Sequence, residues 1–483
     1  MKLLRLTALL FTAIISKQAS AQEMWGIVNS NYAGNMGLEL NPASIAMSPI
    51  KYELNLISGN VSFQNDYLYV PKEKVSIGKL YKGKIKTEDW LDRYTPTDKN
   101  AYIHLLVKGP SFYMRRGETA FGLHASLRSD IAIRGINYQL AKFFYEGSDY
   151  VPQQQLDLLA SDNKVTGLAF GEVGLSLAQQ FKSGTKGKLA VGITVNYLYG
   201  MGGMYVKNSG MNYSFNNETL LTVSDLNADF GYSLPTGENN NYFKQRGSGY
   251  STTIGFQYMH NFNPYAYNIH VRKLKKYKYK VGASLVDAGS ILFSTETKTY
   301  SFNKSSFNWV GFDTASVKSV DDFSQQINTK VYDVVDGAQT NTEYRGQLPT
   351  AFSAQFDYSI SSILYVNASL MQPLQGKATG VRRPAQFSVT PRVELWRYEI
   401  SFPLSMYEYK QFRAGMALRL GQVIIGSDYL TALTGLSDFD GMDLYVGIRH
   451  STYATNHMGK AGKKAKKDPE HEPKPNPMMR TPK

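Results

Sequence analysis

The sequence has no cysteine and no long apolar run beyond its N-terminus, and both absences exclude classes of protein. Without cysteine there can be no disulfide scaffold, thiolate metal site or cysteine nucleophile. The mean hydropathy is −0.32, which argues against a bundle of membrane-spanning helices. Charged residues make up only 19 % of the 483 residues, whereas aromatic residues make up 13 % and glycine numbers 41. This composition excludes a disordered or coiled-coil chain.

The first 21 residues have the three parts of a secretory signal peptide. Lys2 and Arg5 precede an apolar stretch of residues 6–15, and the small residues of positions 19–21 follow. Such a stretch is too short to span ~30 Å of hydrocarbon as a helix. We expect cleavage after Ala21, and no cysteine follows that could carry a lipid. The mature protein is therefore expected to be exported, and then either soluble or inserted into an outer membrane.

The rest of the chain repeatedly alternates apolar and polar residues, as strands with two different faces do. In residues 120–128, phenylalanine, leucine and alanine alternate with glycine, histidine, serine and arginine, and residues 188–197 alternate in the same way. A secreted sandwich also alternates. Many of these segments run for 10 to 18 residues, however, and their polar face is rich in glycine, serine and charge. Both features favour a transmembrane barrel over a sandwich.

The pattern predicts an all-β fold, a transmembrane antiparallel β-barrel of about 14 strands over residues 51–452. The predicted strands are 51–66, 101–114, 119–129, 166–181, 188–206, 249–260, 279–294, 347–358, 362–372, 384–395, 398–406, 411–419, 422–431 and 442–451. The connections alternate between long and short, with exceptions at 261–278 and 407–410. An even number of strands places both termini on the periplasmic side of the outer membrane. Seven aromatic residues near predicted strand ends are expected in the interfacial girdle: Tyr102, Tyr113, Tyr138, Tyr199, Trp396, Tyr398 and Tyr429.

Two sets of motifs resemble known barrels. The segment Asn41-Pro42-Ala43 ahead of the first strand resembles the long-chain fatty-acid transporter class, which implies 14 strands and an N-terminal plug. A broader set, which adds residues 48–49, 109–112, 282–289, 426–429 and 445–447, is similar to an uncharacterised family of outer-membrane barrels from gliding-type Gram-negative bacteria. Some relatives of that kind sit beside the type 9 secretion machinery. The resemblance implies architecture and location.

Residues 22–50 are predicted to be a plug inside the barrel lumen. The segment mixes many apolar residues with Gly34, Gly37, Pro42 and Pro49, which break any long helix or strand. Irregular backbone is tolerated at membrane depth only where protein surrounds it. We expect the segment at the periplasmic end of the lumen, with Asn41-Pro42-Ala43 at its turn. An extra strand is the alternative.

No pattern in the sequence predicts an enzyme, and we expect neither a cofactor nor a metal. The seven histidines lack ligand spacing, and no nucleophile elbow, zinc-protease or phosphate-loop motif occurs. His124 and Asp130 are interpreted as polar groups of the lumen. The acids Asp438, Asp440 and Asp443 resemble a calcium loop but lack its glycine and terminal glutamate, so a solvated loop is favoured. Gly200, Gly202 and Gly203 are interpreted as clearance or a kink within a strand.

The positive charge gathers in two places that are expected to face the periplasm. The long inner connection carries Arg272, Lys273, Lys275 and Lys276, and a Lys- and Pro-rich tail, residues 453–483, contains Lys463, Lys464, Lys466 and Lys467. We expect the tail to be disordered. Its available partners there are anionic lipid, peptidoglycan or an acidic protein, and no nucleic acid is expected.

Two functions remain open from the sequence. One is passage of a small apolar solute through a plugged barrel, with outer-membrane lipid and a hydrophobic small molecule as partners. The other is a structural or accessory barrel that binds periplasmic envelope or secretion proteins. An apolar lumen with a side opening favours transport, and a filled lumen favours the structural role.

Overall fold

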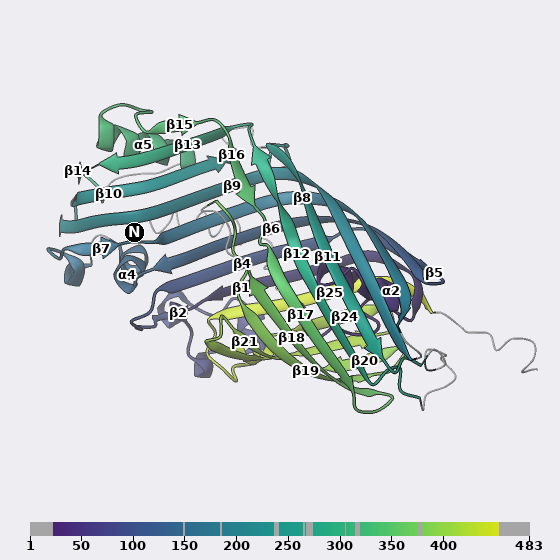
Figure 1. Ribbon diagram of the computed structural model, residues 1–483. Helices are drawn as coiled ribbons and strands as arrows, with labels where there is room; N and C mark the ends of the chain where they lie inside the picture. Colours follow the sequence, from purple (N-terminus) through teal and green to yellow (C-terminus); the bar gives the residue numbers. More distant parts are fainter. Residues whose placement is uncertain are drawn as a thin grey trace, which may run out of the picture.

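The computed structural model describes residues 23–147, 150–183, 186–235, 241–263, 266, 274–304, 306–313, 319–374 and 379–453. Most of them form one antiparallel sheet that closes on itself (Figure 1). The closing pair joins β1 (Ile50–Asn65) to β25 (Gly441–Tyr453), with Ile50 opposite Tyr453 and Gln64 opposite Gly441. The predicted signal peptide and all of the basic tail beyond residue 453 lie outside the described residues.

Fourteen strands form the wall, as predicted, and four of them are built in two pieces. After β1 they are β4 (Lys99–Lys108) with β5 (Ser111–Arg116), β6 (Thr119–Ile136), β8 (Asn163–Ser183), β9 (Gly187–Asn217), β11 (Gly247–His260), β12 (Tyr279–Phe293), β16 (Tyr344–Gln347) with β17 (Ala351–Ser359), β18 (Leu364–Pro373), β19 (Gln386–Glu394), β20 (Tyr398–Ser401) with β21 (Leu404–Tyr407), β22 (Gln411–Ala414) with β23 (Met416–Leu420), β24 (Val423–Ser427) and β25. We refer to the end where β1 begins and β25 ends as the terminal end, and to the opposite end as the extension end.

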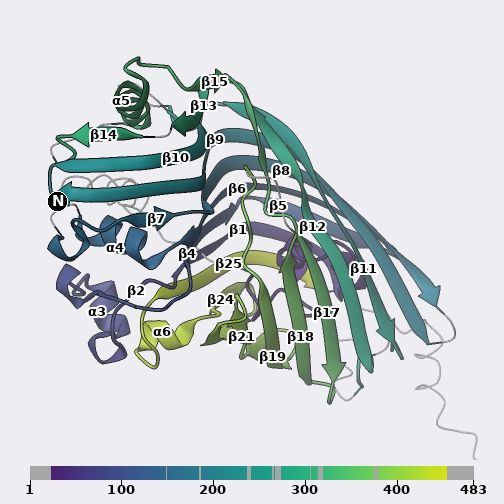
Figure 2. The same ribbon diagram turned by 60° about the vertical axis from the view of Figure 1, so that its left-hand side comes forward.

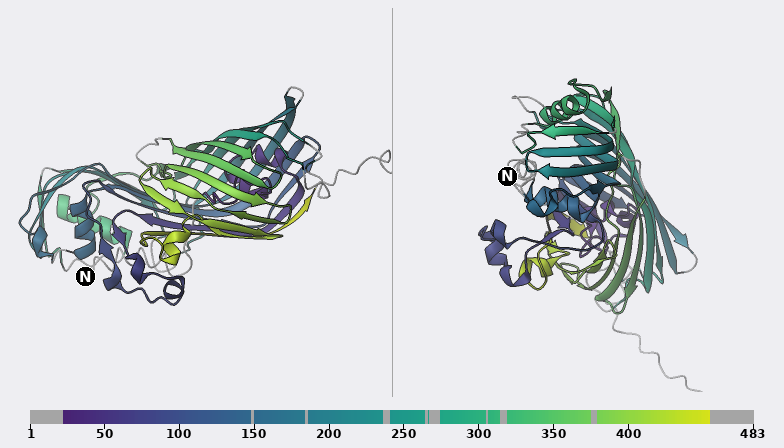
Figure 3. Two further views of the ribbon diagram at one scale, coloured as in Figure 1. Left: turned by 90° about the horizontal axis from the view of Figure 1, so that it is seen from below. Right: turned by 90° about the vertical axis from the view of Figure 1, so that its left-hand side faces the viewer.

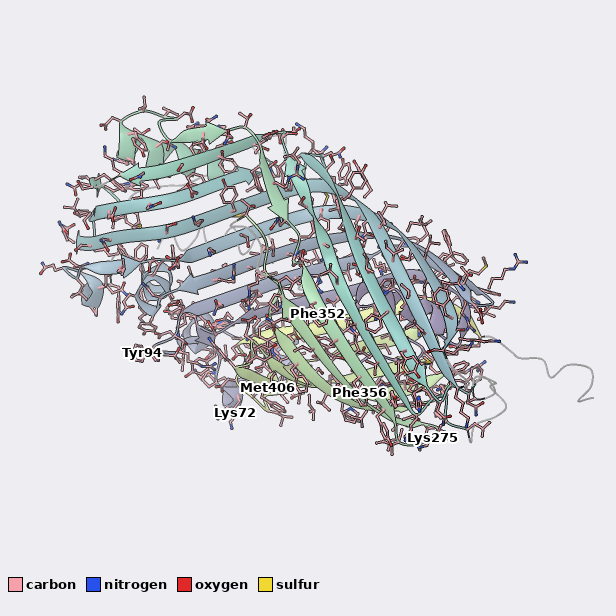
Figure 4. All side chains as sticks on the ribbon, in the orientation of Figure 1. Lys72, Tyr94, Lys275, Phe352, Phe356 and Met406 are labelled. Atoms are coloured by element: carbon pink, nitrogen blue, oxygen red, sulfur yellow. The ribbon has the colours of Figure 1, made fainter. Side chains whose placement is uncertain are left out.

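The two faces of the wall follow the predicted alternation. On β9, Val191, Ile193 and Val195 are exposed, whereas Thr194 and Asn196 between and beside them are buried. Phe352 and Phe356 likewise lie on the outer face of β17 (Figure 4). The outer face is therefore an apolar belt suited to lipid, and the inner face carries the polar and charged residues.

Beyond the extension end, the wall continues as a folded sheet (Figure 2). The 31-residue strand β9 runs through both parts, because a register shift at Gly200–Gly202 lets it bend. The sheet contains β7 (Leu158–Ala160), β10 (Leu220–Ser233), β13 (Thr297–Lys304), β14 (Phe307–Val310) and β15 (Gln339–Asn341), and its helices are α4 (Tyr138–Glu146) and α5 (Val320–Tyr332). The sequence reading placed these residues in loops, and that reading was wrong. Gly203 was interpreted from the sequence as providing clearance or a kink. The structure agrees with clearance, because an added Cβ would lie 2.4 Å from the Tyr344 hydroxyl.

Short elements complete the extension end and the N-terminal segment. They are η1 (Gly34–Glu39), α2 (Ser44–Met47), β2 (Leu68–Tyr69), η2 (Lys72–Lys74), α3 (Ile77–Tyr81), η3 (Thr87–Asp89), β3 (Leu91–Asp92), η4 (Val151–Gln153) and α6 (Leu430–Thr434). Among the described residues, no helix has the length and apolar character needed to cross a membrane.

The predicted aromatic girdle is wrong for four of its residues. Tyr102, Tyr113 and Tyr429 are buried, and each uses its ring or hydroxyl inside the protein. Tyr138 lies on α4, beyond the barrel. Position near a strand end does not decide whether a ring faces lipid, because the alternation of the strand decides it.

Candidate functional site: the filled lumen

The N-terminal segment, residues 23–49, is enclosed by the barrel and is buried along almost its whole length (Figure 3). At one extreme, Glu23 forms an ion pair with Arg383 at the extension end, with 2.7 Å between Oε1 and NH1. At the other, the Tyr32 ring meets the Tyr453 ring edge-on at the terminal end. The segment thus has contacts at both ends of the lumen, whereas the sequence predicted that it lies at the periplasmic end alone.

A buried ion pair clamps the loop of this segment nearest the terminal end. Arg449 NH1 lies 2.8 Å from Glu53 Oε2 and donates to the Ala33 carbonyl, while NH2 donates to the Tyr32 carbonyl at 2.6 Å. The other Glu53 oxygen accepts from a backbone N–H of the segment, that of residue 35, at 2.7 Å. Gly34 is required here, because it has φ +65° and an added Cβ would lie 2.1 Å from Glu53 Oε2. We refer to Glu53 and Arg449 as the clamp.

The motif Asn41-Pro42-Ala43 lies in a shallow bay that two wall glycines, Gly192 and Gly255, create. An added Cβ at Gly192 would lie 2.5 Å from backbone atoms of Pro42 and Ala43, and one at Gly255 would lie 2.3 Å from Asn41 Oδ1. Gly192 and Gly255 are directly paired across β9 and β11. The wall therefore has no side chain where the turn approaches it.

The Asn41 amide also fixes the turn by hydrogen bonds. Its Nδ2 donates to the Phe256 carbonyl at 2.9 Å and to Gln355 Oε1 at 3.1 Å, and its Oδ1 accepts from the Ala43 N–H at 3.1 Å. The polar groups of the Asn41 side chain and the Ala43 N–H of the turn thereby have hydrogen-bond partners inside the lumen.

Next to the clamp, a network of opposite charges lines the wall and holds residues 30 and 31. Arg392 makes a bidentate contact with Asp357 at 2.7 and 2.8 Å, and its Nε lies 3.2 Å from Glu394. Lys276 Nζ lies 2.7 Å from the same Glu394 carboxylate. That carboxylate accepts from the backbone and amide of Asn31. Because these charges are fully buried, each needs its partners to remain in place.

A second polar cluster closes the extension end beneath residues 379–385. Asp287 accepts from Arg128 NH2 at 2.8 Å and from Arg383 NH2 at 2.7 Å, so it joins the wall to the loop. Arg382 of the same loop donates to Tyr102 and to Glu408. A cavity of about 30 Å³ remains beneath the loop, which is enough for water but not for a hydrocarbon.

Other residues singled out in the sequence take structural places. His124 is buried in the wall, while Asp130 pairs with His104 and Arg128 instead. Asp438 and Asp440 pair with Arg93, and Asp443 accepts from the backbone N–H of Asp428, so each of these acids has a protein partner. Within the part of the chain that the structure describes, no three histidines or acids lie together as a metal site would require.

The basic inner connection is only partly described, and Arg272 and Lys273 lie outside the described residues. Lys275 lies at the terminal end (Figure 4) and donates to the Ser359 carbonyl. Lys276 has a different place from the one expected, because it is buried against Glu394 and the Tyr32 and Tyr365 rings. The Lys276 ammonium group therefore lies inside the lumen and not on the periplasmic surface of the connection. The tail residues Lys463, Lys464, Lys466 and Lys467 lie outside the described residues.

Sequence reasoning identified the turn motif Asn41-Pro42-Ala43, but it missed the wall residues that hold the segment, Glu53 and Arg449 among them. A signal was present, since Glu53, Asp357, Arg392 and Glu394 all occur in the inward phase of predicted strands. Charges of both signs in that phase indicate that the lumen holds ion pairs.

Comparison with known proteins gives a family and distant structural likenesses. No curated protein matches the sequence. A mutant of the monoaromatic hydrocarbon channel TodX is similar at 9 % identity, 88 % coverage of this chain, 95 % of that chain and a TM-score of 0.41. The toluene transporter TbuX of Ralstonia pickettii has 9 % identity, coverages of 87 % and 94 %, and a TM-score of 0.41. A FadL homologue of Pseudomonas aeruginosa has 10 % identity, coverages of 91 % and 99 %, and a TM-score of 0.31.

Likenesses at these scores carry no argument about function, and the barrel is established by its own strand pairing. The family comparison is stronger, because one family model matches residues 42–428, which is more than half of the chain. The expectation of an uncharacterised family is confirmed: this transmembrane barrel belongs to a family of unknown function, DUF5723.

Proposed function

We propose that this protein is an outer-membrane barrel that is closed by its own N-terminal segment and serves as a structural or accessory component of the cell envelope. In this proposal residues 22–50 are a plug. The observation that carries it is the filling of the lumen, where the segment is bound by the clamp, the glycine bay and the Arg392 network. Moving such a segment would leave several buried charges without partners, which is costly.

The orientation follows from strand number and connection length. Fourteen strands place the beginning of β1 and the end of β25 side by side, and most of the short turns lie at that terminal end. Barrels of this kind have short periplasmic turns and longer external connections. We therefore assign the terminal end, the basic inner connection and the tail to the periplasm, and the folded extension to the outside.

A second candidate is passage of a small apolar solute, and one observation favours it. Beneath residues 379–385 an apolar cluster, which includes Phe170, Phe293 and Tyr344 and is joined by Val381 of that loop, lines the inside of the extension end. An apolar solute could bind there if the loop opened. The cavity would have to widen well beyond its about 30 Å³.

Reconstitution into lipid vesicles and planar bilayers separates the two functions. We expect the intact protein to conduct no ions and not to speed the entry of toluene, used as the apolar probe. Deletion of residues 24–46 removes most of the plug and should give steady ion conductance. The substitution Arg116→Met, at an exposed site of the terminal end, is the control and should leave the barrel closed.

Two results would contradict the structural role. Accelerated toluene entry through the intact protein would favour transport. A deletion variant that assembles, as judged by its heat-modifiable migration in gels, and yet conducts no more than the intact protein would refute the plug. Mass spectrometry of material co-purified in mild detergent then tests for an envelope partner.

A further inference from the structure

A strongly basic segment projects from the extension end beside the barrel. Residues 72–86, which we refer to as the basic arm, contain six lysines and one glutamate. Two of these lysines have acidic partners, Lys74 with Asp89 and Lys86 with Glu88, and both pairs are solvent-exposed. Exposed pairs of this kind are weak. The arm therefore keeps a large positive surface charge.

The arm is a folded feature, because apolar residues fix it to the barrel rim. Val75, Leu80 and Ile85 pack with Phe439 and Tyr429 in one cluster. The Trp90 ring meets the Phe439 ring edge-on, and Arg93 pairs with Asp438 and Asp440 just before β25 begins. These contacts turn the lysines outward. Lys72 and Tyr94 can be seen projecting near this rim (Figure 4).

The anchor point sets the height of the arm relative to the membrane. On β25 the exposed apolar residue nearest the extension end is Leu444, three positions from Gly441 where the strand begins. At ~3.3 Å per strand residue the rim lies about 10 Å farther along the strand, which for a strand tilted by about 40° is about 7–8 Å along the membrane normal. This is the depth of the polar headgroup layer.

The arm also exposes apolar groups where a headgroup layer would receive them. The Tyr81 side chain is 91 % exposed and Ile77 is 57 % exposed, although both belong to a short helix between lysines. Leu436, next to α6, is 74 % exposed. Lysines combined with a few apolar side chains are typical of segments that bind anionic membrane surfaces.

We propose that the basic arm binds the phosphate groups of glycolipid headgroups in the leaflet at the extension end. The ammonium groups complement phosphate charge, and Tyr81 and Ile77 enter the adjoining apolar layer. The assignment of this leaflet to the cell exterior rests on the orientation proposed above, but the binding chemistry does not. The barrel would thereby be held in a fixed relation to the lipid beside its folded extension.

Native mass spectrometry of the full-length protein in detergent tests this directly, with bis-phosphorylated lipid A as the probe. The variant K79E/K82E/K84E reverses three exposed charges, and we expect it to bind lipid A on the order of 100-fold more weakly. The control K51E/K182E reverses two exposed lysines at the terminal end and should bind lipid A like the wild type. Raised salt should weaken wild-type binding.

Three results would overturn the proposal: unchanged affinity of the triple variant, equal binding of dephosphorylated lipid A, or equal binding of phosphatidylglycerol. Circular dichroism and heat-modifiable migration show whether the variant is folded. The outcome is independent of pore closure, because the lipid measurement involves no conductance. An externally accessible C-terminus combined with normal lipid A binding would show that only the orientation is wrong.

Discussion

The clamp between Glu53 and Arg449 gives the sharpest test of how the lumen is closed. The substitution Arg449→Met removes two hydrogen bonds to the N-terminal segment, those to the carbonyls of Ala33 and Tyr32, and one ion pair of 2.8 Å. It leaves the Glu53 carboxylate, which is 1 % exposed, without its cationic partner. Removal of one member of a buried ion pair destabilises a protein by about 3–5 kcal/mol. We therefore expect Arg449→Met to lower the free energy of unfolding by about 3–5 kcal/mol.

A double-mutant cycle isolates the contribution of the charge. In the variant E53Q/R449M no buried charge is left unpaired, since the glutamine oxygen can still accept from the Asn35 N–H and its Nε2 can donate to the Ser451 hydroxyl, which accepts in place of donating. We therefore expect the double variant to be less destabilised than the sum of the two single variants by about 2 kcal/mol. Arg116→Met, on the exposed surface at the same end, should change stability by less than about 0.5 kcal/mol.

The assay is reversible denaturant unfolding in lipid vesicles, followed by tryptophan fluorescence. Trp25 belongs to the N-terminal segment, so a variant that retains only Trp25 reports on release of that segment. Bilayer conductance of the same variants shows whether the release opens the pore. A cost below about 1 kcal/mol for Arg449→Met, or strict additivity in the cycle, would refute the reasoning that buried ion pairs hold the segment.

The remaining predictions concern the belt, the extension and the topology. Ile193→Arg places a charge on the lipid face and should cost about 2–4 kcal/mol in vesicle unfolding, whereas Ile193→Leu should cost little; equal costs would show that the face assignment is wrong. In the extension, partial burial of Asp92 acts to raise the pKa of its carboxyl group. Hydrogen bonds from Tyr138 and Lys142 outweigh this effect, so the pKa of Asp92 is lowered. The contribution of ionised Asp92 to the stability of the extension is therefore complete above about pH 4, and it is lost as the pH falls through the lowered pKa. Near-ultraviolet circular dichroism should change in that pH range in the wild type but not in Asp92→Asn. A tag after Lys483 should resist protease added to intact cells, and cleavage without permeabilisation would require the opposite topology.

The sequence by itself determined the barrel and the faces of its wall. Lipid and lumen impose opposite demands on neighbouring residues, so a period of two is present in each strand, as in Val191, Ile193 and Val195 against Thr194 and Asn196. The plug motif was also visible, because Asn41-Pro42-Ala43 interrupts any regular element before the first strand. These are local properties, and local patterns are what a single sequence displays.

Tertiary structure alone decided how the lumen is filled. The partners in the clamp, Glu53 and Arg449, are 396 positions apart, and the bay joins Gly192 and Gly255 to a turn near the N-terminus. Closure of the sheet brings these residues together, and no local pattern specifies which inward charge meets which. The folded extension was missed for a related reason. Of its strands, β7 and β10 pair with the far half of β9, and β13 and β14 pair with β10. Their faces are buried against α4 and α5, so their burial depends on contacts that exist only after the chain has folded.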